Sequence, residues 1–458
     1  MAKNIAVFSD GTGQDGGVRP EQRMSNVFKL YRAARPGPDS SVDARKQVAF
    51  YDPGLGTDES AGSGARPVRA LRKLMGSVFG TGISTNIVDA YEFILNHYEP
   101  GDRIFLVGFS RGAYTARCVA NLLMLCGVPT KVDGKPVPRF RKATRDIAKE
   151  AVSAVFNVGA GKARAEGQEK RDAAARAFRK KYGSNRPDTD AASNAAPYFV
   201  GVFDSAAALG ARGTRRLVLA TLLGAAVLVA SYAAARFASW MFGLGFLWAF
   251  LPLLAALGAV AAWKWRVGMN WRADHYDRLL SGHVAYARHA LAIDENRKDF
   301  ERVKWGSTVQ PAPRPEGSPE PLIQLWFAGN HSDIGGSYPE AESRLSDIAL
   351  DWMIEQVREI PDPLILDDTK LHRSPSPGGI QHCEVAGMAD LLAHRFWGLF
   401  ARIPKLRWAT QLREIDHNAT VHPSVLERFN LPDAPQCAGS GPYRPEALRA
   451  HDDFKHFY

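Results

Sequence analysis

The sequence predicts an α/β three-layer sandwich with a mostly parallel sheet, interrupted by an apolar helical hairpin. Three observations support this fold class. Short, near-continuous apolar segments recur along the chain, as in parallel strands that are covered on both faces. Helical segments lie between them, which is the alternation expected of βαβ units. Two long uncharged runs, residues 217–235 and 237–263, stand apart from this pattern.

The strand and helix candidates follow one another in a regular order. Strands are expected at residues 4–10, 47–53, 103–109, 198–204 and 322–329. Helical segments between them include residues 84–98, 113–127 and 346–360. This pattern predicts the elements and leaves the order of the strands in the sheet open.

The composition is that of a globular protein. A chain of 458 residues accommodates one large domain with insertions or two domains of ordinary size. The four cysteines, at positions 118, 126, 383 and 437, form no CxxC pair and no zinc-binding spacing, so we expect reduced thiols. The N-terminus leads directly into a strand and resembles no cleaved signal peptide, which favours folding in the cytoplasm.

The net charge of +10 is concentrated in one basic segment. Residues 139–181 contain 13 Lys or Arg and 5 Asp or Glu, and are rich in alanine. The pattern predicts a solvated pair of helices inserted in the domain. Attraction to anionic lipid headgroups, about 1 kcal/mol per basic side chain near the surface, is the alternative. Nucleic acid is not an expected partner, because no recognised binding motif accompanies the charge.

The two uncharged runs predict a transmembrane helical hairpin over residues 217–263, with its turn at Arg236. Each run reaches the length of about 20 apolar residues that a bilayer core requires. A buried hairpin in a soluble core is the alternative, but neither run has a polar face. Basic residues at both outer ends place the flanking segments in the cytoplasm. Small residues in the first run are compatible with a homo-oligomer.

The segment "RIFLVGFSRGAYTAR" contains the motif Gly-x-Ser-x-Gly between a strand and a helix. A sharp strand-to-helix turn exposes a serine hydroxyl at the carboxyl edge of a sheet, and the flanking glycines allow the strand and helix backbones to approach each other. We therefore expect Ser110 to be a nucleophile. A serine in an ordinary tight turn is the alternative.

A nucleophilic serine requires a base and an acid. His331 is the expected base because it follows a late strand in the glycine-rich segment "LWFAGNHSDIGGSY". The alternative is a loop histidine that caps the next helix. Asp204 ends a strand and gives the chain order Ser, Asp, His, so it is the favoured acid. Asp333, two residues after His331, is the alternative acid and could instead brace the loop.

Stabilising an oxyanion requires two hydrogen-bond donors. The backbone N–H of Arg111 is one candidate, and a loop after the first strand is the other. That loop consists of Asp10, Gly11, Thr12 and Gly13. A phosphate-binding role for the loop is weaker, because the third glycine of the dinucleotide fingerprint is missing. Asp10 and Asp52 each end a strand and could bind a divalent cation, but we expect no cofactor and no metal.

Several of these segments resemble one known family when taken together. "FSDGTG", "GFSRGAYTAR", "VGVFDSAAALG", "ARHALAIDENRKDFERVKW" and "WFAGNHSDIGGSYPE" resemble, in order, the catalytic domain of the Tle phospholipase effectors of type VI secretion. The resemblance covers about residues 3–360, apart from the hairpin and the basic segment. It implies an α/β-hydrolase-like fold and a Ser-Asp-His esterase acting on phospholipids, with Ser110, Asp204 and His331 at the motif positions. The uninterrupted hairpin departs from the soluble family pattern and favours a resident membrane enzyme.

Together these inferences predict a membrane-anchored serine hydrolase, phospholipase A-like, in the bacterial inner membrane with its catalytic domain facing the cytoplasm. Its partners would be membrane phospholipids and the bilayer itself. The hydrolase would occupy residues 1–213, with the basic insert at about 135–195, and residues 267–458, with the hairpin at 214–266. There are two alternatives. The chain could be an esterase or thioesterase for a smaller acyl substrate, or it could be a catalytically silent membrane scaffold.

Overall fold

The structure, a computed structural model, describes most of the chain: residues 2–11, 23–54, 83–159, 164–205, 213–269, 283–300, 302, 305, 316–385, 409–437 and 439–458. Its centre is a six-stranded sheet with the order β10-β9-β8-β3-β1-β2, in which all paired strands are parallel. The strands are β1 (Asn4–Ser9), β2 (Gln47–Asp52), β3 (Arg103–Phe109), β8 (Pro197–Phe203), β9 (Tyr286–Ala292) and β10 (Leu322–Phe327). The predicted α/β class with a mostly parallel sheet is therefore confirmed.

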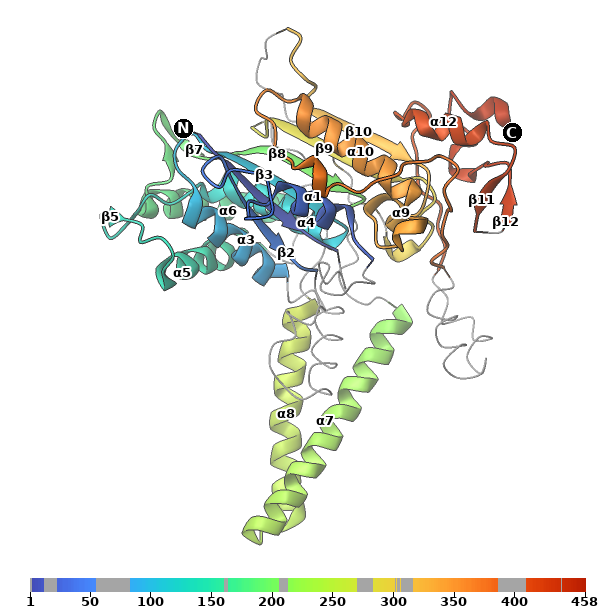
Figure 1. The fold of residues 1–458 in the computed structure, drawn as a ribbon. Helices are drawn as coiled ribbons and strands as arrows, with labels where there is room; N and C mark the ends of the chain where they lie inside the picture. The colour runs from blue at the N-terminus through green and yellow to red at the C-terminus, as the bar shows by residue number, and fades with distance from the viewer. Residues whose placement is uncertain are drawn as a thin grey trace.

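Helices cover both faces of the sheet (Figure 1). The two core clusters contain alternate residues of each strand, as the two-residue period of a strand requires. Ile5 and Val7 of β1 join the cluster under α3 (Ile83–His97) and α4 (Arg111–Cys126). Ala6 and Phe8 join the opposite cluster, under α1 (Asn26–Ala34) and α10 (Arg344–Glu359). The sheet is thus buried on both sides, which explains the near-continuous apolar runs of its strands.

Strand β9 was not among the sequence predictions. Its sequence, Tyr-Ala-Arg-His-Ala-Leu-Ala, contains two polar residues that interrupt the apolar run. Both are fully buried in the structure. Arg288 donates to Gln356 Oε1 at 2.6 Å and to the backbone oxygen of Glu320 at 2.9 Å. Tertiary hydrogen bonds of this kind allow polar residues inside a sheet, but they leave no local pattern in the sequence.

The basic segment forms helices, as predicted, but it is not simply solvated. It contains α5 (Lys142–Glu150), a π-helical segment (Ala151–Phe156) and α6 (Arg164–Tyr182). Two short hairpins flank it: β4 (Lys131–Val132) with β5 (Lys135–Pro136), and β6 (Asn185–Arg186) with β7 (Thr189–Ser193). Ile147, Val155 and Phe178 are buried in the core cluster beneath α3 and α4. The segment is therefore an integral layer of the fold, and two of its charged residues, Arg171 and Arg179, are themselves buried.

The two long apolar helices are α7 (Gly213–Phe242) and α8 (Phe246–Met269), and they project away from the sheet (Figure 1). Leu223–Phe242 and Phe246–Trp263 are long and apolar enough to cross a membrane, and only 11% and 6% of these spans are buried. They are therefore not core helices of the globular part. Their mutual packing includes the rings of Tyr232 and Phe246, with centroids 5.5 Å apart.

The expected position of the hairpin turn was wrong. Arg236 lies inside α7, and residues 243–245, Gly-Leu-Gly, form the turn. Gly243 ends α7 with φ of +64°, a conformation that glycine adopts without steric cost. A single arginine does not end a helix, because its long side chain extends outward while the backbone hydrogen bonds continue.

The C-terminal part packs against the ends of β9 and β10. It contains α12 (Pro423–Phe429) and the two-stranded pair β11 (Ala434–Gln436) and β12 (Gly439–Gly441). Cys383 and Cys437 form a disulfide, with 5.1 Å between their Cα atoms. The expectation of four reduced thiols was therefore wrong for this pair, because residues 54 positions apart meet only in the folded chain. Cys118 and Cys126 are free and buried.

This pairing predicts the number of reactive thiols. When the purified protein is unfolded without reductant and alkylated, we expect two modified cysteines, Cys118 and Cys126. Peptide mass spectrometry would identify them, and a sample reduced before alkylation would show all four. Four modified cysteines in the unreduced sample would contradict the disulfide.

Candidate active site

Ser110 lies in the turn between β3 and α4, at the carboxyl edge of the sheet. Its φ of +56° and ψ of −121° are unusual for a residue other than glycine, and such strain is typical of functional turns. The flanking glycines make the turn possible. A Cβ added to Gly112 would lie 2.0 Å from the backbone oxygen of Ser9, and one added to Gly108 would lie 2.5 Å from the backbone oxygen of Gly112. The close approach of β1, β3 and α4 therefore requires glycine at both positions.

His331 is the first residue of the short helix α9 (His331–Gly335), which follows β10. Asn330 caps this helix by accepting from the backbone N–H groups of Ser332 and Asp333. The ring of His331 lies against Phe109, with centroids 4.7 Å apart, and its Nε2 is 2.7 Å from Ser110 Oγ. The cap and the ring contact hold the imidazole against the serine hydroxyl.

Asp204, directly after β8, contacts the other nitrogen of the histidine ring. Its Oδ2 lies 2.6 Å from His331 Nδ1 and accepts from Arg413 Nη2 at 2.9 Å. Its Oδ1 accepts from the backbone N–H of Ala292 at 3.2 Å. Burial by itself would raise the pKa of this carboxyl, but the Arg413 guanidinium and the His331 ring outweigh burial and hold the pKa well below its usual range. Asp204 is therefore ionised at neutral pH.

Asp333 has different partners. Its Oδ1 lies 2.7 Å from His382 Nδ1, and its Oδ2 accepts from the backbone N–H groups of Asn330 and His382, each at 3.0 Å. These contacts brace the loop before α9 and attach it to the segment at His382. The structure thus brings Asp204, rather than Asp333, to the ring nitrogen of His331.

The oxyanion candidates lie next to Ser110. The backbone of Arg111 begins α4, where the N–H groups of a helix's first turn point toward the preceding serine. The loop after β1 is close as well, because a Cβ added to Gly11 would lie 3.3 Å from Ser110 Cβ. In this structure the Gly11 N–H donates to Asp10 Oδ1 at 2.7 Å. Thr12 and Gly13 lie outside the described residues.

Asp10 and Asp52 are buried carboxyls at the ends of β1 and β2. Asp10 accepts from the hydroxyls of Ser25 and Tyr51, and burial raises its pKa to about 6. Burial, followed by the charges of Asp89 and Asp10, raises the pKa of Asp52 to about 8. Within the described ranges, no group of three or more His, Cys, Asp or Glu side chains is arranged to hold a metal ion. The hydrogen bonds of Asp10 join the end of β1 to Ser25, before α1, and to Tyr51 in β2.

Two charged residues next to the site were missed in the sequence. Glu295 is buried and accepts from the backbone N–H of His331 at 3.2 Å. It lies in the segment "ARHALAIDENRKDFERVKW" just after β9, and this position near the end of a strand could have identified it as a candidate site residue. Arg413 comes from a segment whose sequence gives no such indication. It reaches Asp204 because residues 409–411 pair with residues 296–298.

The geometry allows a defined sequence of proton movements. The Ser110 hydroxyl can donate its proton to His331 Nε2 when the serine attacks an electrophile, and the ionised Asp204 stabilises the resulting imidazolium. The N-terminus of α4 offers partial positive charge beside the same hydroxyl. This arrangement is suited to acyl transfer.

Three kinds of similarity to known proteins are found. A family model described as "T6SS, Phospholipase effector Tle1-like, catalytic domain" matches residues 3–356. An uncharacterized protein of Saccharomyces cerevisiae is 35% identical over 133 residues, which are 28% of this chain and 18% of that protein. The crystal structure of an uncharacterized protein from Pseudomonas aeruginosa is 16% identical with a TM-score of 0.37, and the match covers 82% of this chain and 48% of that one.

A further solved structure is that of the Tle1 effector bound to the VgrG spike from the type 6 secretion system. It is 17% identical, with a TM-score of 0.29, and the match covers 75% of this chain and 53% of that chain. The present chain thus spans about half the length of the two solved chains, and less than a fifth of the yeast protein.

The tight contact at Gly112 yields a prediction for stability. We expect Gly112→Ala to destabilise the protein by about 3 kcal/mol, because the new methyl group would force the β1 backbone away from α4. Gly441→Ala is a matched control, since a Cβ there meets no atom within 4 Å. Thermal unfolding followed by circular dichroism would compare the two variants. Equal melting temperatures would contradict the proposed close contact.

The raised pKa of Asp52 predicts how stability varies with pH. The folded protein retains this proton up to about pH 8, whereas the unfolded chain loses it near the ordinary value of 3.8. Between these pH values the folded state binds more protons, so this residue's contribution to stability falls as pH rises. Asp52→Asn should therefore melt at a higher temperature than wild type at pH 8 and show a smaller gain at pH 5. Identical pH profiles for both proteins would contradict the shift.

Proposed function

Because the chain belongs to the family of Tle1-like phospholipase effector catalytic domains, we propose that it is a membrane-anchored serine hydrolase that cleaves ester bonds of phospholipids. The observation that carries this proposal is the hydrogen-bonded series from Ser110 Oγ through His331 to Asp204. The all-parallel sheet and the strand-to-helix turn at the serine are compatible with an α/β-hydrolase-like fold.

In the proposed mechanism, Ser110 Oγ attacks the ester carbonyl while His331 Nε2 takes its proton. The tetrahedral intermediate collapses to an acyl-enzyme, and His331 returns the proton to the departing lysophospholipid oxygen. Water, deprotonated by the same nitrogen, then releases the fatty acid. Asp204 holds the Nδ1–H tautomer throughout, and the product pair is that of a phospholipase A.

The oxyanion would be stabilised mainly at the start of α4. The Arg111 N–H is the proposed first donor, supported by the partial positive charge at the helix N-terminus. The loop of residues 10–13 is the proposed source of the second donor. The Gly11 N–H donates to Asp10 Oδ1 in this structure and must leave it to serve in this role.

The apolar hairpin gives this enzyme access to its substrate. Removing a phospholipid from a bilayer exposes its acyl chains to water, at a cost of about 0.8 kcal/mol per methylene. The helix α7 begins nine residues after Asp204, so its base lies at most about 32 Å from the proposed triad acid. We propose that α7 and α8 span the membrane and hold the site at its surface, which favours a resident membrane enzyme over a secreted one.

The basic residues at both ends of the hairpin favour a bacterial inner-membrane location with the catalytic part in the cytoplasm. Disulfides are rare in that reducing compartment, so the Cys383–Cys437 disulfide argues against this side of the membrane.

Labelling with a fluorophosphonate probe tests the catalytic residues. We expect Ser110→Ala to abolish labelling and Asp204→Asn to slow hydrolysis of a phospholipid roughly 10⁴-fold, because the histidine would lose its oriented tautomer. Asp333→Asn is the matched control and should retain most of the activity. A loss with Asp333→Asn as large as that with Asp204→Asn would assign the acid to Asp333.

Probe labelling and hydrolysis assays also separate the phospholipase from the two alternative functions. Hydrolysis of short-chain esters without hydrolysis of phospholipids would favour an esterase or thioesterase. A folded wild-type protein that does not react with the probe would contradict the enzyme and favour a membrane scaffold.

Alkaline carbonate extraction tests the hairpin. The wild-type protein should remain in the membrane pellet, because two apolar helices of this length resist extraction. A variant in which a flexible linker replaces residues 213–269 should be released and still react with the probe at Ser110. Release of the wild-type protein would contradict membrane insertion.

A further inference from the structure

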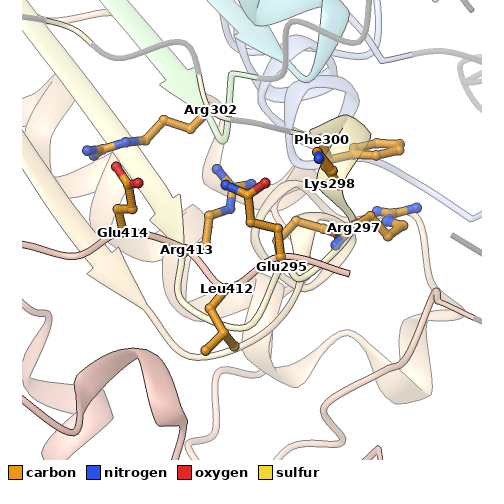
Figure 2. A pocket seen from close by; sticks show the side chains of 9 residues that line it. Glu295, Arg297, Lys298, Phe300, Arg302, Leu412, Arg413 and Glu414 are labelled. Atoms are coloured by element: carbon orange, nitrogen blue, oxygen red, sulfur yellow. Dashed lines mark hydrogen bonds and ion pairs between the residues drawn. The ribbon is translucent and has the colours of Figure 1, made fainter. Parts of the chain in front are cut away.

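A charged cavity adjoins the proposed triad on the side of its acid. A volume of about 50 Å³ in it is open to water-sized groups, which is enough for a small anion. Four basic and two acidic side chains line it: Arg297, Lys298, Arg302, Arg413, Glu295 and Glu414. Figure 2 shows the Arg413 side chain between Arg302 on one side and Arg297 on the other.

Arg413 has hydrogen-bonding capacity that the described residues do not use. Its side chain is 7% exposed, and Nη2 donates to Asp204. Its Nε and Nη1 are buried and have no hydrogen-bond partner within the described part of the chain. Buried guanidinium N–H groups are costly when unpaired, so such an arrangement favours an acceptor that enters the cavity.

The charges around Arg413 also favour an incoming anion. Glu295 is already engaged by Arg297, which donates to both of its oxygens at 2.8 and 2.7 Å. Burial, and next the neighbouring Arg413 guanidinium, lowers the pKa of Arg302, and the carboxylates of Asp204, Asp416 and Glu414 offset this only in part. Lys298 is exposed. An anion between Arg413 and Arg302 would relieve this repulsion.

We propose that this cavity binds a phosphate-class anion, and that the headgroup phosphate of the lipid substrate is its occupant. The assignment of the occupant rests on the proposed phospholipase function. Phosphoryl oxygens are strong acceptors, and each of the two unpaired nitrogens of Arg413, Nε and Nη1, can donate to one of them in a charge-assisted hydrogen bond. Phe300, which lines the cavity, lies against the His331 ring with centroids 5.1 Å apart, so a lipid whose phosphate occupies the cavity would lie beside the proposed triad.

Direct binding tests the anion site without relying on catalysis. Inorganic phosphate would be titrated into detergent-solubilised Ser110→Ala protein by calorimetry in a phosphate-free buffer. Saturable binding is expected, and adding Arg302→Gln with Lys298→Gln should weaken it about tenfold or more, because the Arg302 contact and the positive charge of Lys298 in the cavity lining are lost. Arg449→Gln, at a side chain that is 63% exposed and pairs with Glu446, is the matched control and should bind like the parent.

Hydrolysis kinetics then identify the occupant. The Arg302→Gln/Lys298→Gln enzyme should show about a tenfold higher KM for dioctanoyl phosphatidylglycerol, with an unchanged KM for dioctanoylglycerol, which has no phosphate. Inorganic phosphate should compete with the phospholipid. If phosphate instead changes kcat equally for both substrates, the cavity is a site for free phosphate and the headgroup assignment is wrong.

Failure of the inference is distinguishable from failure of the proposed function. If phosphate does not bind, or binds the double variant as tightly as the parent, the anion site is wrong even when phospholipids are hydrolysed. If phosphate binds but no lipid is cleaved, the anion site stands and the phospholipase function is wrong. As a folding control, Arg302→Gln/Lys298→Gln protein that retains Ser110 is treated with the fluorophosphonate probe. Labelling of Ser110 verifies that the active site of the double variant is folded.

Discussion

The ionised carboxylate of Asp204 is the interaction on which the rest of the site depends. It is fully buried, and its charge is tolerated because Arg413, His331 and the Ala292 N–H all donate to it. A buried carboxylate with fewer partners would take up a proton and would no longer orient the imidazole. Arg413 lies beyond residues 3–356, so the C-terminal part completes a site whose other residues lie within the family-matched region.

Sheet topology is the second constraint. Ser110 follows β3, Asp204 follows β8 and His331 follows β10, and parallel strands bring all three ends to one edge of the sheet. The chain reverses its direction of strand addition between β1 and β3, and ligand sites of open α/β sheets form at such a point. The hairpin enters between β8 and β9 without disturbing their pairing, so an apolar insertion coexists with an intact sheet.

The sequence allowed prediction of the parts of the fold that depend on local pattern. The apolar runs located five of the six strands, and β3 was predicted at its observed bounds. The glycines around Ser110 and the loop around His331 identified residues that the structure places in contact. Strand β9, the Cys383–Cys437 pair and Arg413 were missed because each depends on contacts between distant segments. The turn of the hairpin was misplaced because a charge was taken as its marker instead of Gly243.

The central claim is that Ser110 carries the acyl group during the reaction. Rapid quenching of the enzyme with a short-chain phospholipid, followed by peptide mass spectrometry, tests it most directly. The account predicts an acyl adduct on the peptide containing Ser110, formed and lost at the rate of turnover. Product formation with no acylated Ser110 at any quench time would contradict it and would require direct attack by water.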